Sequence, residues 1–204
     1  HIWDQMTIKP YLQQENRIIR PANYKKFNDG EGCHLYMSRN GKRVLVVNLL
    51  GNLFIDREEL YSPFTTADEI LNSYKLGLNV DAIFIDMHAE ATSEKMSLAN
   101  YLDGRVSAVI GTHTHIPTAD AHILPNGTAF QSDAGMCGDY DSSIGMKKEL
   151  SIERFLNPDA KNHLAPAEGE ATICGTIVEI DGNGLAVSIE PLRIGGKLKQ
   201  THNL

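Results

Sequence analysis

Apolar runs of strand length alternate along the chain with segments in which apolar residues recur every three or four positions. The apolar runs predict strands over 43–50, 82–86, 106–110 and 128–132. The periodic segments predict helices over 66–78, 93–102 and 147–156. Strands and helices that alternate in this way predict an α/β fold, in which helices pack on a sheet.

Turn and capping signals set the boundaries of these elements. Asn40-Gly41 predicts a hairpin that pairs 35–38 with the strand at 43–50. The segment D-G-N-G at 181–184 predicts a second hairpin, between 171–180 and 185–191. Thr66 with Glu69 forms a capping box at the start of one helix, and Ser93 is the expected cap of the next.

Length and composition predict one globular domain over 1–204, because 204 residues with 42% hydrophobic positions bury a single core. A net charge of −7 argues against a groove for a long nucleic acid. The longest apolar runs, such as 44–47, are far shorter than a membrane helix, so no membrane partner is expected. Three widely spaced cysteines indicate no disulfide framework, which together with the lack of a signal-peptide pattern predicts a cytoplasmic protein.

Histidines follow two of the predicted strands. His88 comes directly after the strand at 82–86, and His113 and His115 come after the strand at 106–110. Ligands of layered α/β proteins gather beyond the carboxyl ends of strands. In extended backbone, residues i and i+2 point to the same side and lie roughly 6–7 Å apart. An H-x-H pair can therefore bracket two metal ions about 3.5–4 Å apart, and His88 would add a second nitrogen to one of them.

Other interpretations of these histidines remain open at this point. A histidine at a strand end is often a polar residue that hydrogen-bonds the backbone. The spacing also fits a metal-dependent C–N hydrolase of the amidohydrolase type, although that scaffold is a barrel of roughly 250 residues or more. A third alternative is a catalytically incomplete remnant that acts through protein contacts.

Three longer segments resemble a known family. They are H-A-E-A-T-S-E-K at 88–95, Y-L-D-G-R-V-S-A-V-I-G-T-H-T-H at 101–115 and D-A-G-M-C-G-D-Y-D-S-S-I-G-M at 133–146. R-P-A-N-Y at 20–24 and P-F-T-T-A-D at 63–68 are similar to that family too. The chain thus resembles, over nearly its whole length, the YmdB-like family of bacterial calcineurin-like metallophosphoesterases.

The resemblance implies a metallophosphatase-type α/β sandwich of two mixed sheets flanked by helices. It implies hydrolysis of small phosphodiesters, with cyclic nucleotides as the substrate class, at a dinuclear site that holds two divalent or trivalent transition-metal ions (Mn, Fe or Zn). By matching motifs, His88 and His113 would bind one metal and His115 the other. H-I-W-D at the start of the chain matches a family segment whose histidine acts on the leaving group, so His1 is the expected catalytic residue.

The resemblance also implies a difference from the family. The family domain carries further metal-ligating Asp, Glu and Asn residues before the position matched by His1, and this sequence has no match to them. The chain is therefore expected to correspond to the C-terminal three-quarters of that domain, to lack its N-terminal strands and to need an N-terminal segment to complete the site. On its own it should bind metals poorly and hydrolyse slowly, because imidazoles leave two nearby cations poorly compensated. Assembly into a homo-oligomer is compatible with the sequence.

Overall fold

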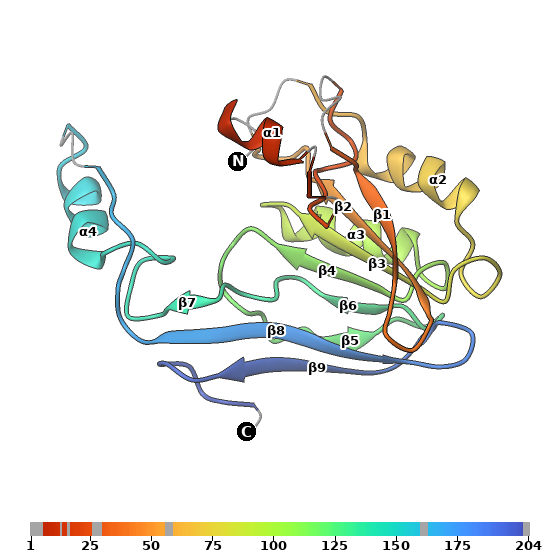
Figure 1. Cartoon of the computed structure of the whole chain (residues 1–204). Coiled ribbons are helices and arrows are strands. Elements are labelled where there is room, and N and C mark those ends of the chain that lie inside the picture. Colours follow the sequence, from red (N-terminus) through yellow and green to blue (C-terminus); the bar gives the residue numbers. More distant parts are fainter. Residues whose placement is uncertain are drawn as a thin grey trace.

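A computed structural model describes residues 6–12, 14–15, 17–25, 30–55, 59–159 and 163–201. The chain forms two stacked sheets with helices outside them (Figure 1). The larger sheet contains β1 (Cys33–Met37), β2 (Arg43–Leu50), β3 (Ala82–His88), β4 (Ala108–Thr112), β5 (His122–Ile123) and β6 (Ala129–Gln131). The smaller sheet contains β7 (Gly138–Asp139), β8 (Ala171–Ile180) and β9 (Ala186–Ile194). The helices are a 3-10 turn at Met6–Ile8, α1 (Lys9–Leu12), α2 (Pro63–Ser73), α3 (Thr92–Tyr101) and α4 (Lys148–Leu156).

The six-stranded sheet has the order β1-β2-β3-β4-β6-β5. Its four inner strands run parallel, and the two edge strands β1 and β5 run antiparallel to their neighbours. Parallel neighbours need crossover connections, and α2 and α3 supply these between β2, β3 and β4. The parallel arrangement places the carboxyl ends of β3 and β4 side by side.

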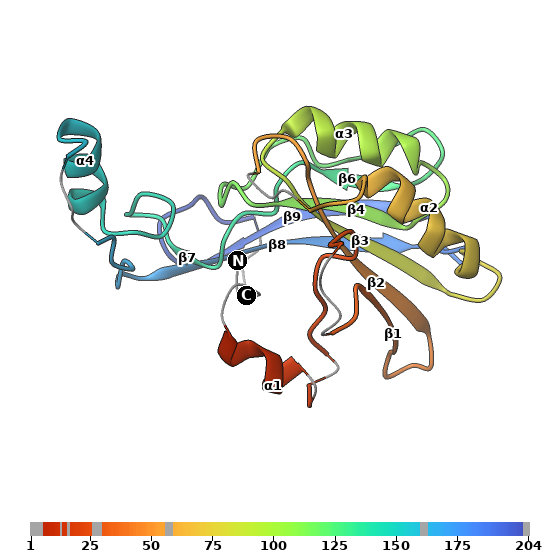
Figure 2. The same ribbon diagram turned by 90° about the horizontal axis from the view of Figure 1, so that it is seen from above.

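Helices α2 and α3 cover one face of this sheet (Figure 2). Leu71 of α2 and Leu98 of α3 belong to the same buried cluster as Leu45, Ile83 and Ile85 of the central strands. Side chains alternate between the faces of a strand, so these odd-numbered strand positions all point toward the helices. The strands over 43–50 and 82–86 are thus confirmed, and β4 extends to Thr112, directly before the H-x-H pair.

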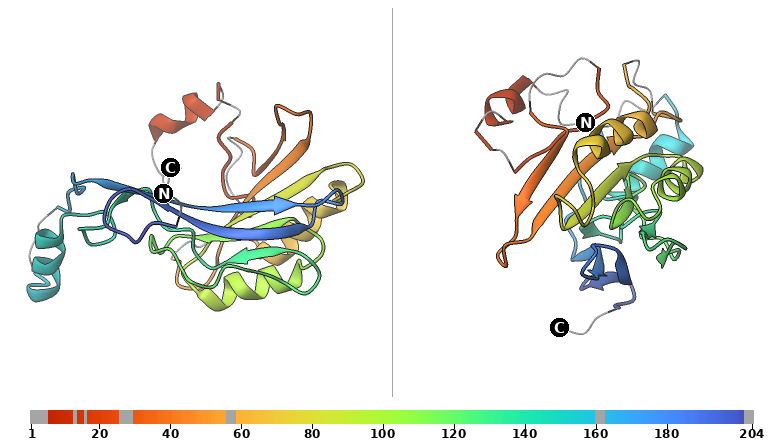
Figure 3. Two further views of the ribbon diagram at one scale, coloured as in Figure 1. Left: turned by 90° about the horizontal axis from the view of Figure 1, so that it is seen from below. Right: turned by 90° about the vertical axis from the view of Figure 1, so that its right-hand side faces the viewer.

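The other face of the large sheet packs against the smaller sheet (Figure 3). Phe84 and Ile110 contribute to a second apolar cluster that includes Val178 of β8 and Ile189 of β9. The predicted two-sheet α/β sandwich is confirmed, as are both hairpins. The large sheet is mixed as expected, whereas the small sheet is antiparallel throughout its described pairs.

Two capping interpretations are wrong. Helix α2 begins at Pro63, with Ser62 as N-cap, and Thr66 is buried inside the helix. Proline suits the first helical position because the N–H that it lacks would have had no partner there. Helix α3 begins at Thr92 with Ala91 as N-cap, so Ser93 lies within the helix. Among the described residues, no helix is both long and apolar enough to cross a membrane.

Candidate active site

His88 and His113 meet at the carboxyl ends of two parallel strands. His88 is the last residue of β3, and it pairs in register with Thr112, the last residue of β4. His113 follows directly. The Nε2 atom of His88 lies 3.2 Å from Nδ1 of His113, and the two ring planes are inclined at 81°. The sheet therefore brings together two of the histidines predicted from the sequence.

His115 lies at the same cavity but faces a different partner. The cavity has a volume of about 310 Å³ and is lined by His88, Glu90, His113, Thr114, His115 and Ile144. The Nδ1 atom of His115 is 2.8 Å from the carbonyl oxygen of Ile144. All three predicted metal-ligating histidines thus line one cavity, whereas His1 lies outside the described residues.

Glu90 is a residue of the cavity that the sequence reasoning missed. Its carboxylate lies 3.0 Å from Nε2 of His113, and its side chain is half exposed. The available signal was the H-A-E segment, which places an acidic residue two positions after His88 just past the end of β3.

The backbone around the H-x-H pair adopts a conformation that is unusual for residues with side chains. His113 has a φ of 107° and His115 a φ of 68°. Such conformations cost about 1–3 kcal/mol each and persist where the surroundings hold them in place. Thr114, between the two histidines, donates hydrogen bonds from its N–H and its hydroxyl to Oδ2 of Asp133, over 2.9 and 2.8 Å.

Asp133 is in turn held by a buried lysine. Lys95 of α3 places Nζ 3.2 Å from Oδ2 of Asp133, and both side chains are only 1% exposed. The other carboxylate oxygen accepts the N–H of Gly135. A buried charge is stable only when it is paired and hydrogen-bonded, as this one is. The pair fixes the histidine-bearing loop to helix α3.

Close packing at Gly111 also fixes the loop that carries His113 and His115. The carbonyl oxygen of Gly111 accepts the N–H of Ala134 over 2.9 Å. A Cβ atom at position 111 would lie 1.7 Å from the carbonyl oxygen of Ser132. Position 111 therefore requires glycine, because β4 and the chain after β6 approach too closely for any side chain.

A second carboxylate, that of Asp86, is linked to His88 through the hydroxyl of Thr112. Thr112 donates its hydroxyl to Oδ1 of Asp86 over 2.7 Å, and Asn48 donates to Oδ2 over 2.7 Å. The hydroxyl oxygen of Thr112 is 3.0 Å from Nδ1 of His88. Burial raises the pKa of Asp86, and these two hydrogen bonds act against that rise.

The electrostatic surroundings keep His88 neutral. Burial, followed by the neighbouring His113, lowers the pKa of His88 to about 4. The ring is consequently uncharged at neutral pH, and the neutral imidazole is the form that binds metal ions.

The chemistry of these donors fits a transition-metal ion in part. Two nitrogens that bind one ion at about 2.0–2.1 Å lie roughly 2.9–3.4 Å apart, and His88 and His113 present theirs at 3.2 Å. Imidazole nitrogens and a carboxylate suit zinc, iron or manganese. Within the part of the chain that the structure describes, however, no group of three or more His, Cys, Asp or Glu side chains is gathered closely enough to form a ligand set. The pair fits one ion, and further ligands are required to complete a site.

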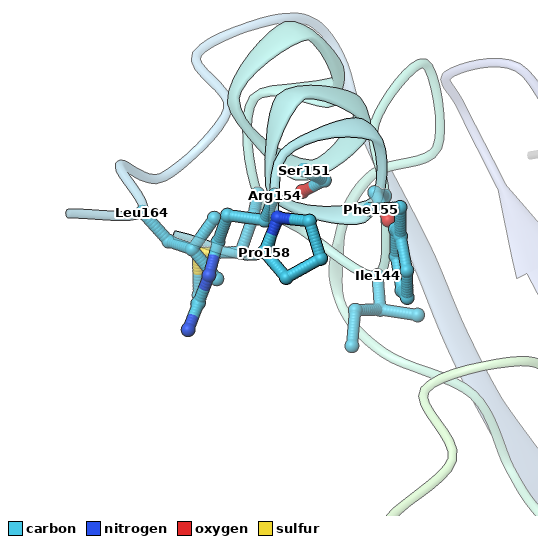
Figure 4. A pocket seen from close by; sticks show the side chains of 8 residues that line it. Ile144, Ser151, Arg154, Phe155, Pro158 and Leu164 are labelled. Atoms are coloured by element: carbon cyan, nitrogen blue, oxygen red, sulfur yellow. The ribbon is translucent and has the colours of Figure 1, made fainter. Parts of the chain in front are cut away.

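Ile144 also lines a second, larger cavity. A cavity of about 440 Å³ lies between the turn at 143–146 and helix α4, and Ile144 lines both cavities. Arg154 and Phe155 of α4 and Pro158 surround it (Figure 4). A guanidinium and an aromatic ring thus line a cavity that shares the residue Ile144 with the histidine cavity.

Sequence comparison decides the family. The pattern of the YmdB-like protein family matches residues 1–192. The chain belongs to the YmdB-like family. A YmdB-like relative from Bacillus subtilis (strain 168), the 2′,3′-cyclic-nucleotide 2′-phosphodiesterase, is 43% identical over 195 residues, which are 95% of this chain and 72% of the relative.

Solved structures of similar proteins agree with the fold of this YmdB-like chain. A hypothetical protein from Thermus thermophilus matches with a TM-score of 0.86 at 39% identity, over 96% of this chain and 73% of that one. A novel phosphatase from Mycoplasma pneumoniae matches with a TM-score of 0.84 at 31% identity, over 95% and 69%. The resemblance drawn from the sequence motifs is confirmed.

Proposed function

We propose that this YmdB-like protein hydrolyses phosphodiester bonds of small cyclic nucleotides, with 2′,3′-cyclic nucleotides as the favoured class. The observation that carries the proposal is the meeting of His88, Glu90, His113 and His115 around one cavity at the ends of β3 and β4. The activity printed for the Bacillus subtilis relative supports the choice of substrate.

The proposed site holds two divalent or trivalent transition-metal ions, manganese, iron or zinc. His88 and His113 would hold one ion, because their facing nitrogens have the spacing that a shared ion requires. His115, on the other side of Thr114, would hold the second. Bound ions of this kind supply Lewis-acid stabilisation of the charge that develops on phosphoryl oxygens.

The residues of the chain contribute rigidity and proton transfer. The Lys95–Asp133 pair holds Thr114, so the histidines on either side keep one arrangement before substrate arrives. Such preorganisation avoids rearrangement during the reaction. His1 is proposed to donate a proton to the leaving oxygen, a step worth about 10²–10⁴-fold in rate.

The proposal is tested by measuring diesterase activity and metal content together. The protein is expressed with any residues that its gene encodes before His1, and is assayed on 2′,3′-cyclic AMP and bis-p-nitrophenyl phosphate. In His113→Ala we expect a lower metal content and a rate reduced by more than the roughly 10–100-fold that loss of an outer partner costs. His122→Ala is the matched control, because His122 is exposed on the edge strand β5 and its Nδ1 hydrogen-bonds the carbonyl oxygen of Asp120, two residues earlier in the chain.

Three results would contradict the proposal. Equal activity and metal content in His113→Ala and wild type would exclude the histidine cavity as the site. Hydrolysis of cyclic amides in place of phosphodiesters would favour the C–N hydrolase. A protein that binds no metal and cleaves neither substrate would favour the non-catalytic alternative.

A further inference from the structure

We propose that the cavity between helix α4 and the turn at 143–146 binds the nucleobase of the substrate, with Ile144 and Phe155 as specificity-determining residues. The inference rests on the proposed function, because it concerns the part of a cyclic nucleotide that extends beyond the phosphate. It adds a binding site for an aromatic heterocycle to the phosphate site proposed at the histidines.

The structure of the substrate class requires the two sites to adjoin. In a 2′,3′-cyclic nucleotide the base is attached to C1′ of the ribose, and the phosphate bridges the oxygens on C2′ and C3′. A protein that holds this phosphate at the histidines therefore needs its base site directly beside them. Ile144 meets this requirement, because it lines both the histidine cavity and the cavity of about 440 Å³ at α4.

The turn that carries Ile144 is bonded to the histidine loop. The carbonyl oxygen of Ile144 lies 2.8 Å from Nδ1 of His115. Ser143 and Met146 close the turn, because the backbone N–H of each donates to the carbonyl oxygen of the other, over 2.9 and 3.0 Å. These bonds hold Ile144 in one place beside the histidine loop.

Ile144 has a backbone conformation that a branched side chain disfavours. Its φ is 49°, in the left-handed region, and Gly145 after it has a φ of 94°. Glycine would adopt both conformations without strain. The isoleucine is 53% exposed, so packing in the core does not offset this cost. Strained residues cluster where a ligand is held, and contact with a bound base gives the side chain of Ile144 such a role.

The lining of the α4 cavity suits a flat heterocycle. Its apolar walls include Ile144, Phe155 and Leu164, and Arg154 adds N–H donors for the nitrogen and oxygen acceptors of a base. Small-molecule sites combine apolar walls with a few polar groups in this way. Phe155 is 87% exposed, which leaves its ring free to stack on a base. Figure 4 shows Ile144 and Phe155 on one side of the cavity and Arg154 on the other.

The proposal is tested with two substrates that share a five-membered cyclic phosphate. One is 2′,3′-cyclic AMP, which carries a base, and the other is glycerol 1,2-cyclic phosphate, which carries none. The ratio of their kcat/KM values measures recognition of the base. In Phe155→Ala this ratio should fall about 5–150-fold, the range expected when stacking on a base is lost. It should fall in Ile144→Gly as well, and Phe155→Tyr, which keeps an aromatic ring, should retain it.

Leu156→Ala is the matched control. Leu156 is the next residue of α4 and is 81% exposed, but it is not among the residues that line the cavity. Its variant should keep the wild-type ratio. Adenosine, which has the base and no phosphate, gives a readout without a chemical step. Its affinity for the full protein, measured by saturation-transfer NMR titration, should be weaker in Phe155→Ala and unchanged in Leu156→Ala.

The outcomes separate this inference from the proposed function. Equal ratios and equal adenosine affinities in Phe155→Ala and wild type overturn the base site and leave the phosphodiesterase proposal standing. Weaker adenosine binding in Phe155→Ala, with no hydrolysis of either substrate by any form, supports the base site and overturns the proposed function. An oligomer that dissociates in both alanine variants by light scattering, with the ratio unchanged, would mean that a second copy covers α4 and would overturn the base site.

Discussion

Helices α3 and α4 show how little the composition of a helix says about its burial. Helix α3 is mostly polar, yet Leu98 and Ala99 are fully buried and Glu94 and Lys95 are buried beside them. Helix α4 carries Ile152, Phe155 and Leu156, which are 55%, 87% and 81% exposed. In α4, which is described along its whole length, Ser151 alone is buried.

The difference lies in what each helix is attached to. Helix α3 is a crossover between two parallel strands and must lie on the sheet, whereas α4 stands away from both sheets (Figures 1 and 3). The buried charges of α3 have specific partners. Lys95 pairs with Asp133, and Glu94 accepts the backbone N–H groups of Asn52 and Leu53. Lys95 thus ties α3 to the residue that holds Thr114, and Glu94 ties it to the chain directly after β2.

The largest expected effect comes from breaking the buried ion pair. Lys95→Ala leaves the carboxylate of Asp133 without its cation, and should lower the free energy of unfolding by about 3–5 kcal/mol. Urea denaturation measures the change. Lys75→Ala, at an exposed lysine, is the matched control and should stay close to wild type. A Lys95 variant as stable as the control would mean that the pair is not formed in solution.

The same apolar truncation on the two helices tests the comparison directly. Leu98→Ala removes a fully buried side chain and should destabilise the protein by about 2–5 kcal/mol. Leu156→Ala removes an exposed one and should change stability by less than about 0.5 kcal/mol. Thermal or urea unfolding of both variants gives the comparison. Equal losses would show that α4 is covered in solution.

The smallest expected effect on stability comes from neutralising one glutamate on each helix, Glu94 of α3 and Glu149 of α4. Glu94→Gln keeps the shape of the side chain but removes a charge that accepts two backbone N–H groups, and should cost about 1–3 kcal/mol. Glu149→Gln makes the same exchange at an exposed position of α4 and should be nearly neutral. A Glu94 variant that unfolds at the same urea concentration as the Glu149 variant would contradict the structural role.

The strands and the histidines could be predicted because their signals are local. The apolar runs before His88 and His113 place both at strand ends, and the parallel pairing of β3 and β4 brings these ends to the same edge of the sheet. The residues that support the histidines could not be found in this way, because they are far apart in the sequence. Thr112 of β4 contacts Asp86 of β3, and Lys95 contacts Asp133, which is 38 positions later in the chain. The α2 boundary was missed because Pro63 outweighs the local pattern at Thr66.

Gly111 has a consequence for any attempt to redesign this protein. A single methyl group at that position would act as a wedge between β4 and the carbonyl of Ser132, and would also press on the stem of Lys95. The distance between the loop that carries His113 and His115 and the segment that carries Asp133 is therefore fixed by this close packing. In the proposed active site, the part that can be redesigned is therefore the rim, where the residue Ile144 is more than half exposed.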